Sequence, residues 1–537
     1  MLNILKSGMR RVFPDHTARG RTIRAVASRM GLSHDLSWSR SYATYILSVE
    51  PESFFPPVTD HEPGDSPFFS VVVPFFNTPD KYLFPLLDSL ASQSFQDWEL
   101  IMVDASTNEA RARIIESQSH TDPRFRYVRL HENKGISWNT NQALPHVGGK
   151  FVVFADHDDT LSPHALNEMF IAIEDHPDVD ILYSDEDVLS DDGRMRKGPF
   201  FKPSWSPHMF LEMNYTNHLS VIKTDLVRQV GGLRPERDGA QDYDLLLRIH
   251  ALPRLIRVVH VPKILYHWRE AEHSTARTIS TKTYALDAGQ SALMDYLEAI
   301  GVEHGGVEHL PGRPGWYRTH PRQKCTAEVI VMVSDDQRVN NQFMALLQSR
   351  TRCAWVNPTF TSLYPDADVK AHCASRNEDV VVTVRAMFLP DEEMWLDELA
   401  GVLALPQTAA VTPLLMGNMF GHLINSGLME KSGTLQPLYR GCDVSAGGSA
   451  GPPDLVRDVD GVSPNVVAFP RDTAHRELFL DDDIDGRDWN DLLVVWGYTR
   501  FTLKRFPYKD RRLNDNLALS GPTVVLRNDI EFGLKTV

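Results

Sequence analysis

Short apolar runs alternate with helix-like spacings along residues 66–275. The apolar runs lie at 69–73, 99–103 and 151–154, and a further predicted strand, RYVRL, lies at 126–130. Runs of this length predict buried strands. The first is followed by the helical spacing Tyr82, Leu86, Leu87 and Leu90, and further helices are predicted at 108–119 and 136–146. Strands that alternate with helices favour an α/β fold with a mostly parallel sheet covered by helices on both faces.

Polar residues follow each of these predicted strands. The strand ends read Pro74-Phe75-Phe76-Asn77, Asp104-Ala105-Ser106, Asn133-Lys134-Gly135 and Asp156-His157-Asp158. In such a sheet, ligands bind outside the carboxyl ends of the strands. The pattern therefore predicts a ligand site at one edge of the sheet.

The most acidic of these ends is FADHDDTL, residues 154–161. Asp156 and Asp158 are two residues apart after a strand, so their side chains point to roughly the same side. Two carboxylates suit a hard divalent cation, Mg²⁺ or Mn²⁺, and leave room for phosphate oxygens. A loop that caps a helix beginning near Pro163 would need only one aspartate. The cluster therefore predicts a metal site.

An apolar run followed by D-x-D-x-T also resembles the first motif of haloacid-dehalogenase-type phosphatases. In that interpretation Asp156 is the nucleophile, Asp158 the acid and Thr160 a phosphate contact. That motif normally ends the first strand of its domain, whereas three predicted strands with polar ends precede it here. A phosphatase also leaves Asp104 and residues 133–135 without a task.

A second resemblance covers roughly residues 68–275, where eight motifs follow the order seen in family 2 glycosyltransferases of the GT-A fold. The motifs are SVVVPFFN (70–77), IMVDAS (101–106), NKGISWNTNQAL (133–144), FADHDD (154–159), YSDED (183–187), FFKPSWSP (200–207), GGLRPERDGAQDYDLLLR (231–248) and YHWR (266–269). The order is most similar to that of bacterial transferases that build O-antigen and other surface polysaccharides. Ala105 departs from the pattern, because a second aspartate is common there.

The resemblance implies roles for individual residues. Asp242, at the predicted start of a helix, matches the family's catalytic base, and a helix N-terminus favours its ionised form. Asp104 matches the aspartate that accepts a hydrogen bond from the nucleotide base. The other expected donor contacts are Pro74, Phe76, Asn77, Lys134, Gly135, Asn141, Asp156 and His157, and the expected acceptor contacts are Asp185, Gln241, Asp244 and Trp268. The expected metal ligands are Asp156, Asp158 and His267.

Three of these interpretations have structural alternatives. Asp244 would orient the acceptor or pair with Arg248, four residues on. His267 would bind the metal through a neutral imidazole or pack beside Trp268. Arg269 would contact the diphosphate or form a surface ion pair.

The sequence thus predicts a metal-dependent, inverting glycosyltransferase of polysaccharide or O-antigen synthesis. The predicted donor is a nucleoside diphosphate sugar, and the predicted acceptor is a glycan or a lipid-linked glycan. Two alternatives are the phosphatase described above and a non-catalytic scaffold that binds nucleotide sugars.

Residues 326–537 repeat the pattern in weaker form. EVIVMV (328–333) and the helical spacing of Phe343, Leu346 and Leu347 repeat the opening, and DGRDWNDLL (485–493) echoes DGAQDYDLL (238–246). FGHLINSGL (420–428) also resembles a stretch of family 2 domains. DVVVTVRAMFLPDEEMW (379–395) parallels KFVVFADHDDTLSPHAL (150–166); with Pro390 matched to Pro163, Thr383, Arg385 and Ala386 replace the three aspartates. This half is therefore predicted to be a duplicated GT-A-like domain without the metal, used for structure, acceptor binding or oligomerisation. A second transferase with metal-independent chemistry is the alternative.

The predicted division is a basic helical arm at 1–65, a catalytic GT-A domain at 66–278, a helix and linker at 279–325 and the degenerate domain at 326–537. The first 40 residues carry eight Lys/Arg against two Asp. Basic and apolar residues interleaved in this way favour contact with an anionic membrane surface, or a helical arm packed on the next domain.

Composition narrows the choice of partners and location. A formal charge of −16 over 537 residues argues against nucleic-acid binding, which needs a basic footprint. The longest apolar stretches fall short of the length that predicts a transmembrane helix. The four cysteines show no C-x-x-C spacing, so neither a zinc site nor a disulfide framework is expected. The expected location is the reducing cytoplasm. The basic N-terminal arm would contact the inner face of the plasma membrane there.

Overall fold

The computed structural model describes most of the chain between residues 42 and 416 and several strands beyond. The described ranges are 42–58, 61–271, 283–332, 337–363, 372–373, 376–385, 388–416, 423–425, 428–431, 434–437, 457–459, 461–462, 466–471, 492–503 and 524–525. The basic stretch 1–40 and most of DGRDWNDLL lie outside these ranges. Within the described residues, no helix is long and apolar enough to cross a membrane.

The first sheet has nine strands in the order β3-β2-β1-β4-β8-β6-β9-β5, with β7 paired to β6. The strands are β1 (Phe69–Phe75), β2 (Trp98–Asp104), β3 (Phe125–Arg129), β4 (Phe151–Phe154), β5 (Thr160–Leu161), β6 (Ile181–Leu189), β7 (Arg196–Phe200), β8 (Ser220–Lys223) and β9 (Val258–Arg269). Strands β3, β2, β1 and β4 are parallel, whereas β8 runs antiparallel to β4 and β6. The sheet is therefore mixed, as in the GT-A fold, and its carboxyl-end edge gathers the polar strand ends of the parallel half.

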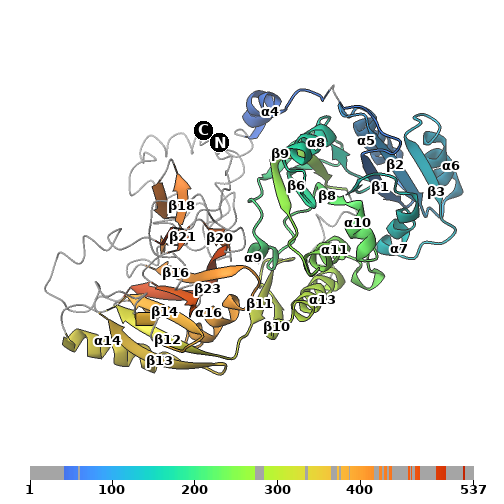
Figure 1. Ribbon diagram of the computed structural model, residues 1–537. Coiled ribbons are helices and arrows are strands. Elements are labelled where there is room, and N and C mark those ends of the chain that lie inside the picture. Colours follow the sequence, from blue (N-terminus) through green and yellow to red (C-terminus); the bar gives the residue numbers. More distant parts are fainter. Residues whose placement is uncertain are drawn as a thin grey trace, which may run out of the picture.

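Helices cover both faces of this sheet (Figure 1). They are α5 (Asp80–Ala91), α6 (Glu109–Gln118), α7 (Ile136–Asn141), α8 (Ala165–Asp175), α9 (Pro207–Phe210), α10 (Thr224–Gln229), α11 (Gln241–His250) and α13 (Thr283–Ala299), with α4 (Glu50–Ser53) ahead of the sheet. Alternate residues of β1 point to opposite faces. Val71 and Val73 pack with Leu83 and Leu86 of α5, whereas Val72 packs with Ile101 and Val103 on the other face.

The segment predicted as a linker forms a hairpin instead. Strands β10 (His304–His309) and β11 (Tyr317–Pro321) pair antiparallel between the two large sheets (Figure 1). One continuous cluster of buried residues includes Tyr243 of α11, Leu293 of α13, Tyr317 of β11 and Phe343 of the second half. The hairpin and α13 therefore join the two halves through a shared core.

The second large sheet also has nine strands, in the order β13-β12-β14-β22-β16-β23-β15. In addition, β17 pairs with β16 and β20 pairs with β23. The main strands are β12 (Cys325–Met332), β13 (Val356–Leu363), β14 (Val380–Arg385), β15 (Phe388–Pro390), β16 (Thr408–Met416), β22 (Val466–Pro470) and β23 (Leu492–Leu503), and the helices are α14 (Gln337–Ser349) and α16 (Trp395–Leu403). The smaller strands are β17 (Leu423–Asn425), β18 (Leu428–Lys431), β19 (Thr434–Pro437), β20 (Arg457–Val459), β21 (Gly461–Val462) and β24 (Val524–Val525).

The two sheets share strand order and strand direction. In each, the opening strand lies between two parallel strands, followed by two antiparallel pairings, a parallel pairing and a short antiparallel edge strand. The parallel pairing is broken at matching places, between Ser184 and Glu186 in β6 and between Pro413 and Leu414 in β16. A strand matching β3 is the one member of the first series that the described part of the second sheet lacks.

This match corrects two details of the predicted repeat. Thr224 N donates to Lys150 O at 3.0 Å, and Arg471 N donates to Asp379 O at 3.0 Å, so position 379 corresponds to 150. Counting along the paired strands then matches Arg385 to Asp156. The alignment through the prolines had matched it to Asp158, two residues later in the chain. The echo of DGAQDYDLL also fails at its end, because Leu492 and Leu493 begin strand β23 whereas the matching leucines lie in α11.

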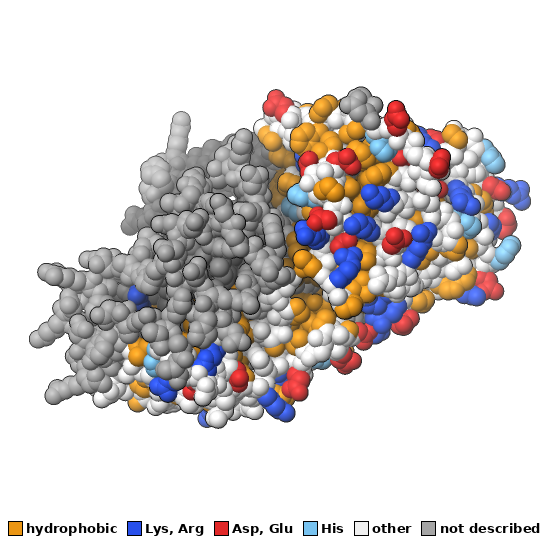
Figure 2. All heavy atoms as spheres, in the orientation of Figure 1, with side chains coloured by type: hydrophobic (Ala, Val, Ile, Leu, Met, Phe, Trp, Pro, Cys, Tyr) orange, Lys and Arg blue, Asp and Glu red, His pale blue; other side chains and the backbone are white. Residues whose placement is uncertain are grey.

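Charged side chains of both signs are interspersed over the visible face of the first half (Figure 2). On that face the described residues form no continuous basic stripe of the kind that follows a nucleic-acid backbone.

Candidate active site

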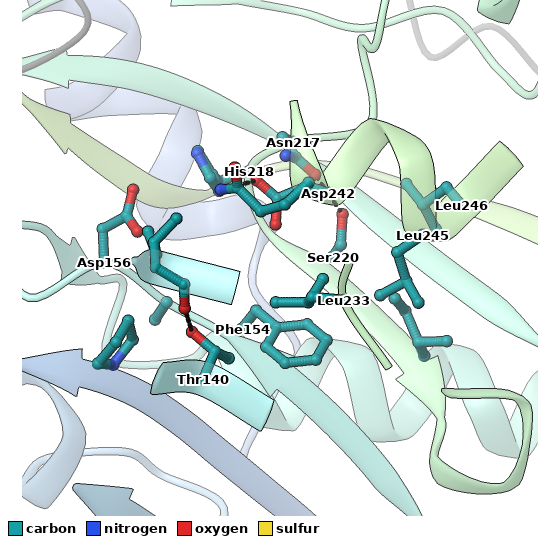
Figure 3. A pocket seen from close by; sticks show the side chains of 15 residues that line it. Thr140, Phe154, Asp156, Asn217, His218, Ser220, Leu233, Asp242, Leu245 and Leu246 are labelled. Carbon is teal, nitrogen blue, oxygen red and sulfur yellow. Dashed lines mark hydrogen bonds between the residues drawn. The ribbon is translucent and has the colours of Figure 1, made fainter. Parts of the chain in front are cut away.

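A pocket lies between the end of β4 and the start of α11 (Figure 3). It is lined by Pro74, Ile136, Thr140, Phe154, Ala155, Asp156, Asn217, His218, Ser220, Ile222, Leu233, Gln241, Asp242, Leu245 and Leu246. The buried leucines of α11 pack into the core, which fixes the helix so that its first turn presents Asp242 to the pocket. The pocket thus brings together the predicted base and Asp156, one of the predicted metal ligands.

The surroundings of Asp242 suit a general base. Burial and, to a smaller extent, the charge of Asp156 together raise the pKa of Asp242 to about 7. The side chain of Asn217 donates a hydrogen bond that favours the ionised form, and Gln241 Nε2 lies 3.3 Å from Asp242 Oδ2. A carboxyl group with a pKa near neutrality can accept a proton and release it at the same pH.

Asp156 and Asp158 form a half-buried carboxylate pair in the loop after β4. Burial raises the pKa of both groups, and the charge of Asp156 further raises that of Asp158. A divalent cation between them would offset this cost, and Mg²⁺ commonly uses one or two carboxylates together with phosphate oxygens. The two residues therefore fit the expected cation.

His267 does not complete a three-ligand group. Its Nδ1 lies 2.6 Å from Asp187 Oδ1, and Asp187 is its partner in the β6–β9 pairing. Among the described residues, no group of three or more His, Cys, Asp or Glu side chains is placed to hold a metal. The assembled part of the predicted site is thus the Asp156–Asp158 pair.

Strand β9 holds the acidic loop in place. Asp159 is buried, and its two oxygens accept hydrogen bonds from Tyr266 Oη at 2.7 Å and from Arg269 N at 2.7 Å. The Tyr266 hydroxyl also accepts a bond from Asp156 N at 3.1 Å. Arg269 is buried and donates through Nε to Asp158 O at 2.6 Å, so it is neither a diphosphate contact nor a surface ion pair.

Asp104 is a buried support in this structure. Its side chain has no exposed surface, and its oxygens accept hydrogen bonds from Ser106 N at 2.9 Å and from Tyr127 Oη at 2.8 Å. The prediction that Asp104 accepts a bond from a nucleotide base needs an open oxygen. In this arrangement the residue shapes the loop after β2 instead.

The other predicted donor contacts are spread along the same sheet edge. Pro74 lines the pocket and Phe76 is exposed, whereas Asn77, with φ 50°, ties its loop to Thr107 Oγ1 at 3.0 Å and to Asn108 N at 3.0 Å. Lys134 is exposed, and its Nζ lies 2.8 Å from Glu132 Oε2. His157 is half-buried, and its Nδ1 has no hydrogen-bond partner among the described residues.

The prediction that Asn141 contacts the donor is wrong. Its side-chain amide donates to Leu233 O at 2.7 Å and its oxygen accepts from Leu233 N at 2.8 Å. Both ends of the amide are thus used to fasten the segment that precedes α11. Asn141 supports the pocket wall and does not face the donor.

Residues 70–230 match the family described as Glycosyl transferase family 2. The match runs from β1 to the end of α10 and includes the carboxylate pair and the loop that carries Asn217 and His218. Residues 70–230 form a family 2 glycosyltransferase domain. This membership excludes the phosphatase interpretation of the aspartates.

Two proteins of related sequence are considerably longer than this chain. The O-antigen biosynthesis protein RfbC of Myxococcus xanthus is 31% identical over 377 residues, which is 64% of this chain and 29% of that protein. The uncharacterized protein y4gI of Sinorhizobium fredii is 37% identical over 234 residues, 43% of this chain and 26% of that protein. The chain therefore spans less than a third of the length of these two relatives.

Among solved structures, residues 1–349 of S. aureus TarS in complex with UDP-GlcNAc are similar to 43% of this chain. The TM-score is 0.34 and the identity 21%, and the similarity covers 70% of the TarS chain.

Two of the predicted acceptor contacts, Asp244 and Asp185, are buried and bonded to other residues of the fold. Asp244 is buried and bonded to Arg234 Nε at 3.0 Å and Arg248 Nε at 2.9 Å, which is the ion-pair alternative. Asp185 is buried, and its Oδ1 accepts from Lys202 N at 2.8 Å and lies 2.8 Å from His260 Nε2.

The remaining predicted acceptor contacts differ from each other. Trp268 is half-buried and packs against the core of the sheet, whereas Gln241 lines the pocket beside the base.

Asn217 and His218 are pocket residues of the family 2 domain that the sequence analysis missed. They precede strand β8, and Asn217 lies 58 residues (217 − 159) after the last aspartate of the acidic motif. The signal was a polar pair directly before the mostly apolar stretch LSVI, residues 219–222.

Proposed function

We propose that the family 2 domain transfers a sugar from a nucleoside diphosphate sugar to a hydroxyl of a glycan or lipid-linked acceptor, in the synthesis of a surface polysaccharide such as O-antigen. The observation that supports this most is the pocket shared by Asp156 and Asp242. It places a carboxylate pair suited to a diphosphate-bound cation next to a carboxylate suited to deprotonate a hydroxyl.

In this proposal Asp156 and Asp158 hold Mn²⁺ or Mg²⁺, which stabilises the negative charge that develops on the leaving diphosphate. Asp159, Tyr266 and Arg269 keep the loop of the pair in position through the hydrogen bonds described above. His267 is not proposed as a third ligand, because its Nδ1 is engaged with Asp187 and, among the described residues, no three-ligand group forms.

Asp242 is proposed to take the proton of the acceptor hydroxyl. The acceptor oxygen then forms a bond to the anomeric carbon while the bond from that carbon to the diphosphate oxygen breaks. The electron pair leaves with the nucleoside diphosphate. One base and one direct displacement invert the anomeric configuration.

The second half is proposed to be a duplicated GT-A-like domain without this chemistry. The shared strand order, the shared break in the parallel pairing and Arg385 at the place of Asp156 support that proposal. It would then support the fold of the first domain, bind the acceptor or mediate oligomerisation. We place the activity in the cytoplasm, where the basic residues of the stretch 1–40 favour contact with the inner face of the plasma membrane.

The test is a donor screen. The purified chain is incubated with UDP-, GDP- and dTDP-sugars and a glycan acceptor, with Mn²⁺ or with excess chelator, and released nucleoside diphosphate is measured. We expect metal-dependent release with one class of donor. Binding of a nucleotide sugar without turnover would favour the scaffold alternative and contradict the proposal.

A further inference from the structure

We infer that His218 binds a hydroxyl group of the sugar that is transferred, and so helps to select the donor. This inference rests on the proposed function and adds a substrate contact to it. His218 lies in the loop before β8 and lines the pocket that also contains Asp156 and Asp242 (Figure 3).

The peptide groups of His218 are held by two charged side chains, the buried Lys202 and the half-buried Glu186. Lys202 Nζ donates to His218 O at 2.7 Å, and His218 N donates to Glu186 Oε2 at 2.6 Å. The Lys202 side chain has no exposed surface, and its Nζ lies 3.9 Å from Glu186 Oε2. Burying a lysine is costly unless it is paired and bonded. A buried lysine and a half-buried glutamate thus fix one loop residue at the pocket.

The ring of His218 is also fixed. It stacks on Tyr266, with ring centroids 4.8 Å apart and an interplanar angle of 26°. Tyr266 is the residue whose hydroxyl bonds Asp159 and the backbone of Asp156, so the imidazole is tied to the carboxylate side of the pocket. Among the described residues, neither ring nitrogen of His218 takes part in a hydrogen bond that would occupy it.

Charge indicates what the imidazole can recognise. Burial, aided by the nearby Lys202, lowers the pKa of His218 to about 4, so the ring is neutral at physiological pH. A neutral imidazole offers one N–H donor and one acceptor, which matches a hydroxyl group. A diphosphate would instead favour a cationic partner.

The position of His218 in the pocket indicates which hydroxyl group it binds. In the proposed function the diphosphate lies at Asp156 and Asp158, and the acceptor hydroxyl lies at Asp242. The sugar that moves between them must occupy the space in which His218 is presented. A fixed donor–acceptor group there would bind a hydroxyl of that sugar.

The test compares binding of a nucleotide sugar with binding of the corresponding nucleoside diphosphate. His218→Phe keeps an aromatic ring on Tyr266 and removes both ring nitrogens. Affinities are measured by calorimetry with Mn²⁺ for UDP-glucose, UDP-N-acetylglucosamine, GDP-mannose and dTDP-rhamnose, each beside UDP, GDP or dTDP. For the donor that the wild type turns over, we expect about three- to tenfold weaker binding of the sugar form, the usual worth of one neutral hydrogen bond. Binding of the nucleoside diphosphate should stay within about twofold of the wild-type value.

Two further variants control the comparison. His250→Phe is matched, because His250 also stacks on an aromatic ring, that of Trp205 at 4.7 Å, and burial also lowers its pKa to about 4. His250 does not line the pocket, so this variant should leave both affinities unchanged. His218→Gln restores a donor and an acceptor and should recover part of the lost affinity. It also serves as the test if His218→Phe fails to fold.

The outcomes separate this inference from the proposed function. Equal weakening of the sugar form and the diphosphate, or no change in either, would overturn the role of His218 alone. A wild-type chain that binds no nucleotide sugar of the panel would overturn the proposed function and this inference with it.

Discussion

Four aspartates around the pocket differ in their surroundings, and these differences assign their tasks. Asp156 and Asp158 are half-buried and keep oxygens available, whereas Asp159 is buried and bonded to Tyr266 and Arg269. Asp242 faces the pocket from a helix start. The sequence predicted a site at FADHDD, but it could not show which of the three loop aspartates is structural, because that depends on strand β9 more than a hundred residues away.

The first prediction concerns the metal. Asp158→Ala should abolish transfer and weaken Mn²⁺ binding, because half of the carboxylate pair is lost, while the melting temperature is kept. Mn²⁺ binding is measured by electron paramagnetic resonance. Asp225→Ala is the control, since Asp225 is exposed and follows Lys223, which pairs with Phe151 at the start of β4, the opposite end of that strand from the carboxylate pair. Full activity in excess chelator would contradict the metal assignment.

The second prediction concerns stability and pH. The pKa of Asp242 is raised in the folded protein, so the folded chain keeps a proton that the unfolded chain releases. Wild type should therefore lose stability as pH rises from about 4 to about 7, by at most ~1.4 kcal/mol for each unit of pKa shift. Asp242→Asn avoids this loss.

The measurement is the melting temperature of both proteins without metal, at pH 5 and at pH 8. Asp242→Asn should be more stable than wild type at pH 8, and the gain should shrink at pH 5. A variant less stable than wild type at pH 8 would show that Asp242 is ionised and well paired in the fold.

At the scale of elements, the sequence predicted the parallel half of the first sheet well and the rest less well. The predicted strands at 69–73 and 151–154 correspond to β1 (Phe69–Phe75) and β4 (Phe151–Phe154), since buried β-branched and aromatic runs mark such strands. The hairpin β10–β11 was missed because both strands are largely polar and β10 contains two adjacent glycines. The antiparallel pairings of β8 follow from tertiary register, which no local pattern contains.

The third prediction concerns the turn into α7. Gly135 has φ +99°, and a Cβ there would overlap the carboxylate of Asp238, which caps Ser137 N at 3.1 Å. Gly135→Ala should therefore lower the melting temperature and weaken donor binding. Gly231→Ala is the matched control, since Gly231 has φ +79° with no atom within 4 Å of an added Cβ.

Left-handed backbone alone costs a residue with a side chain roughly 1–2 kcal/mol. Gly231→Ala should show only that loss, and Gly135→Ala should exceed it. Equal losses in the two variants would mean that the contact with Asp238 is not important for the turn.

At the scale of the whole molecule, two sheets of the same strand order carry different side chains at the place of Asp156. Arg385 ends β14 where Asp156 follows β4, and a guanidinium at that place cannot share in holding a cation. The sequence suggested the repeat through DVVVTVR, but the alignment through a proline misplaced Arg385 by two positions. The sheet register corrected it, because hydrogen-bonded pairing is independent of loop length.

The fourth prediction follows from this division. Arg385→Ala should leave donor turnover within about twofold of wild type, because the proposed chemistry lies entirely in the first half. Turnover is measured with the donor found in the screen, after thermal unfolding has shown that the variant is folded. Loss of turnover in a folded variant would mean that the second half takes part in the chemistry.

The most direct test of the central claim is a pair of measurements on Asp242→Asn. Asparagine keeps the shape of the side chain but cannot accept the acceptor proton. General-base catalysis contributes about 10²–10⁴-fold, so kcat for transfer should fall by that order while the donor binding constant changes little. A variant that loses donor binding as strongly as turnover would contradict the account, because Asp242 would then hold the donor or the fold instead of taking the proton.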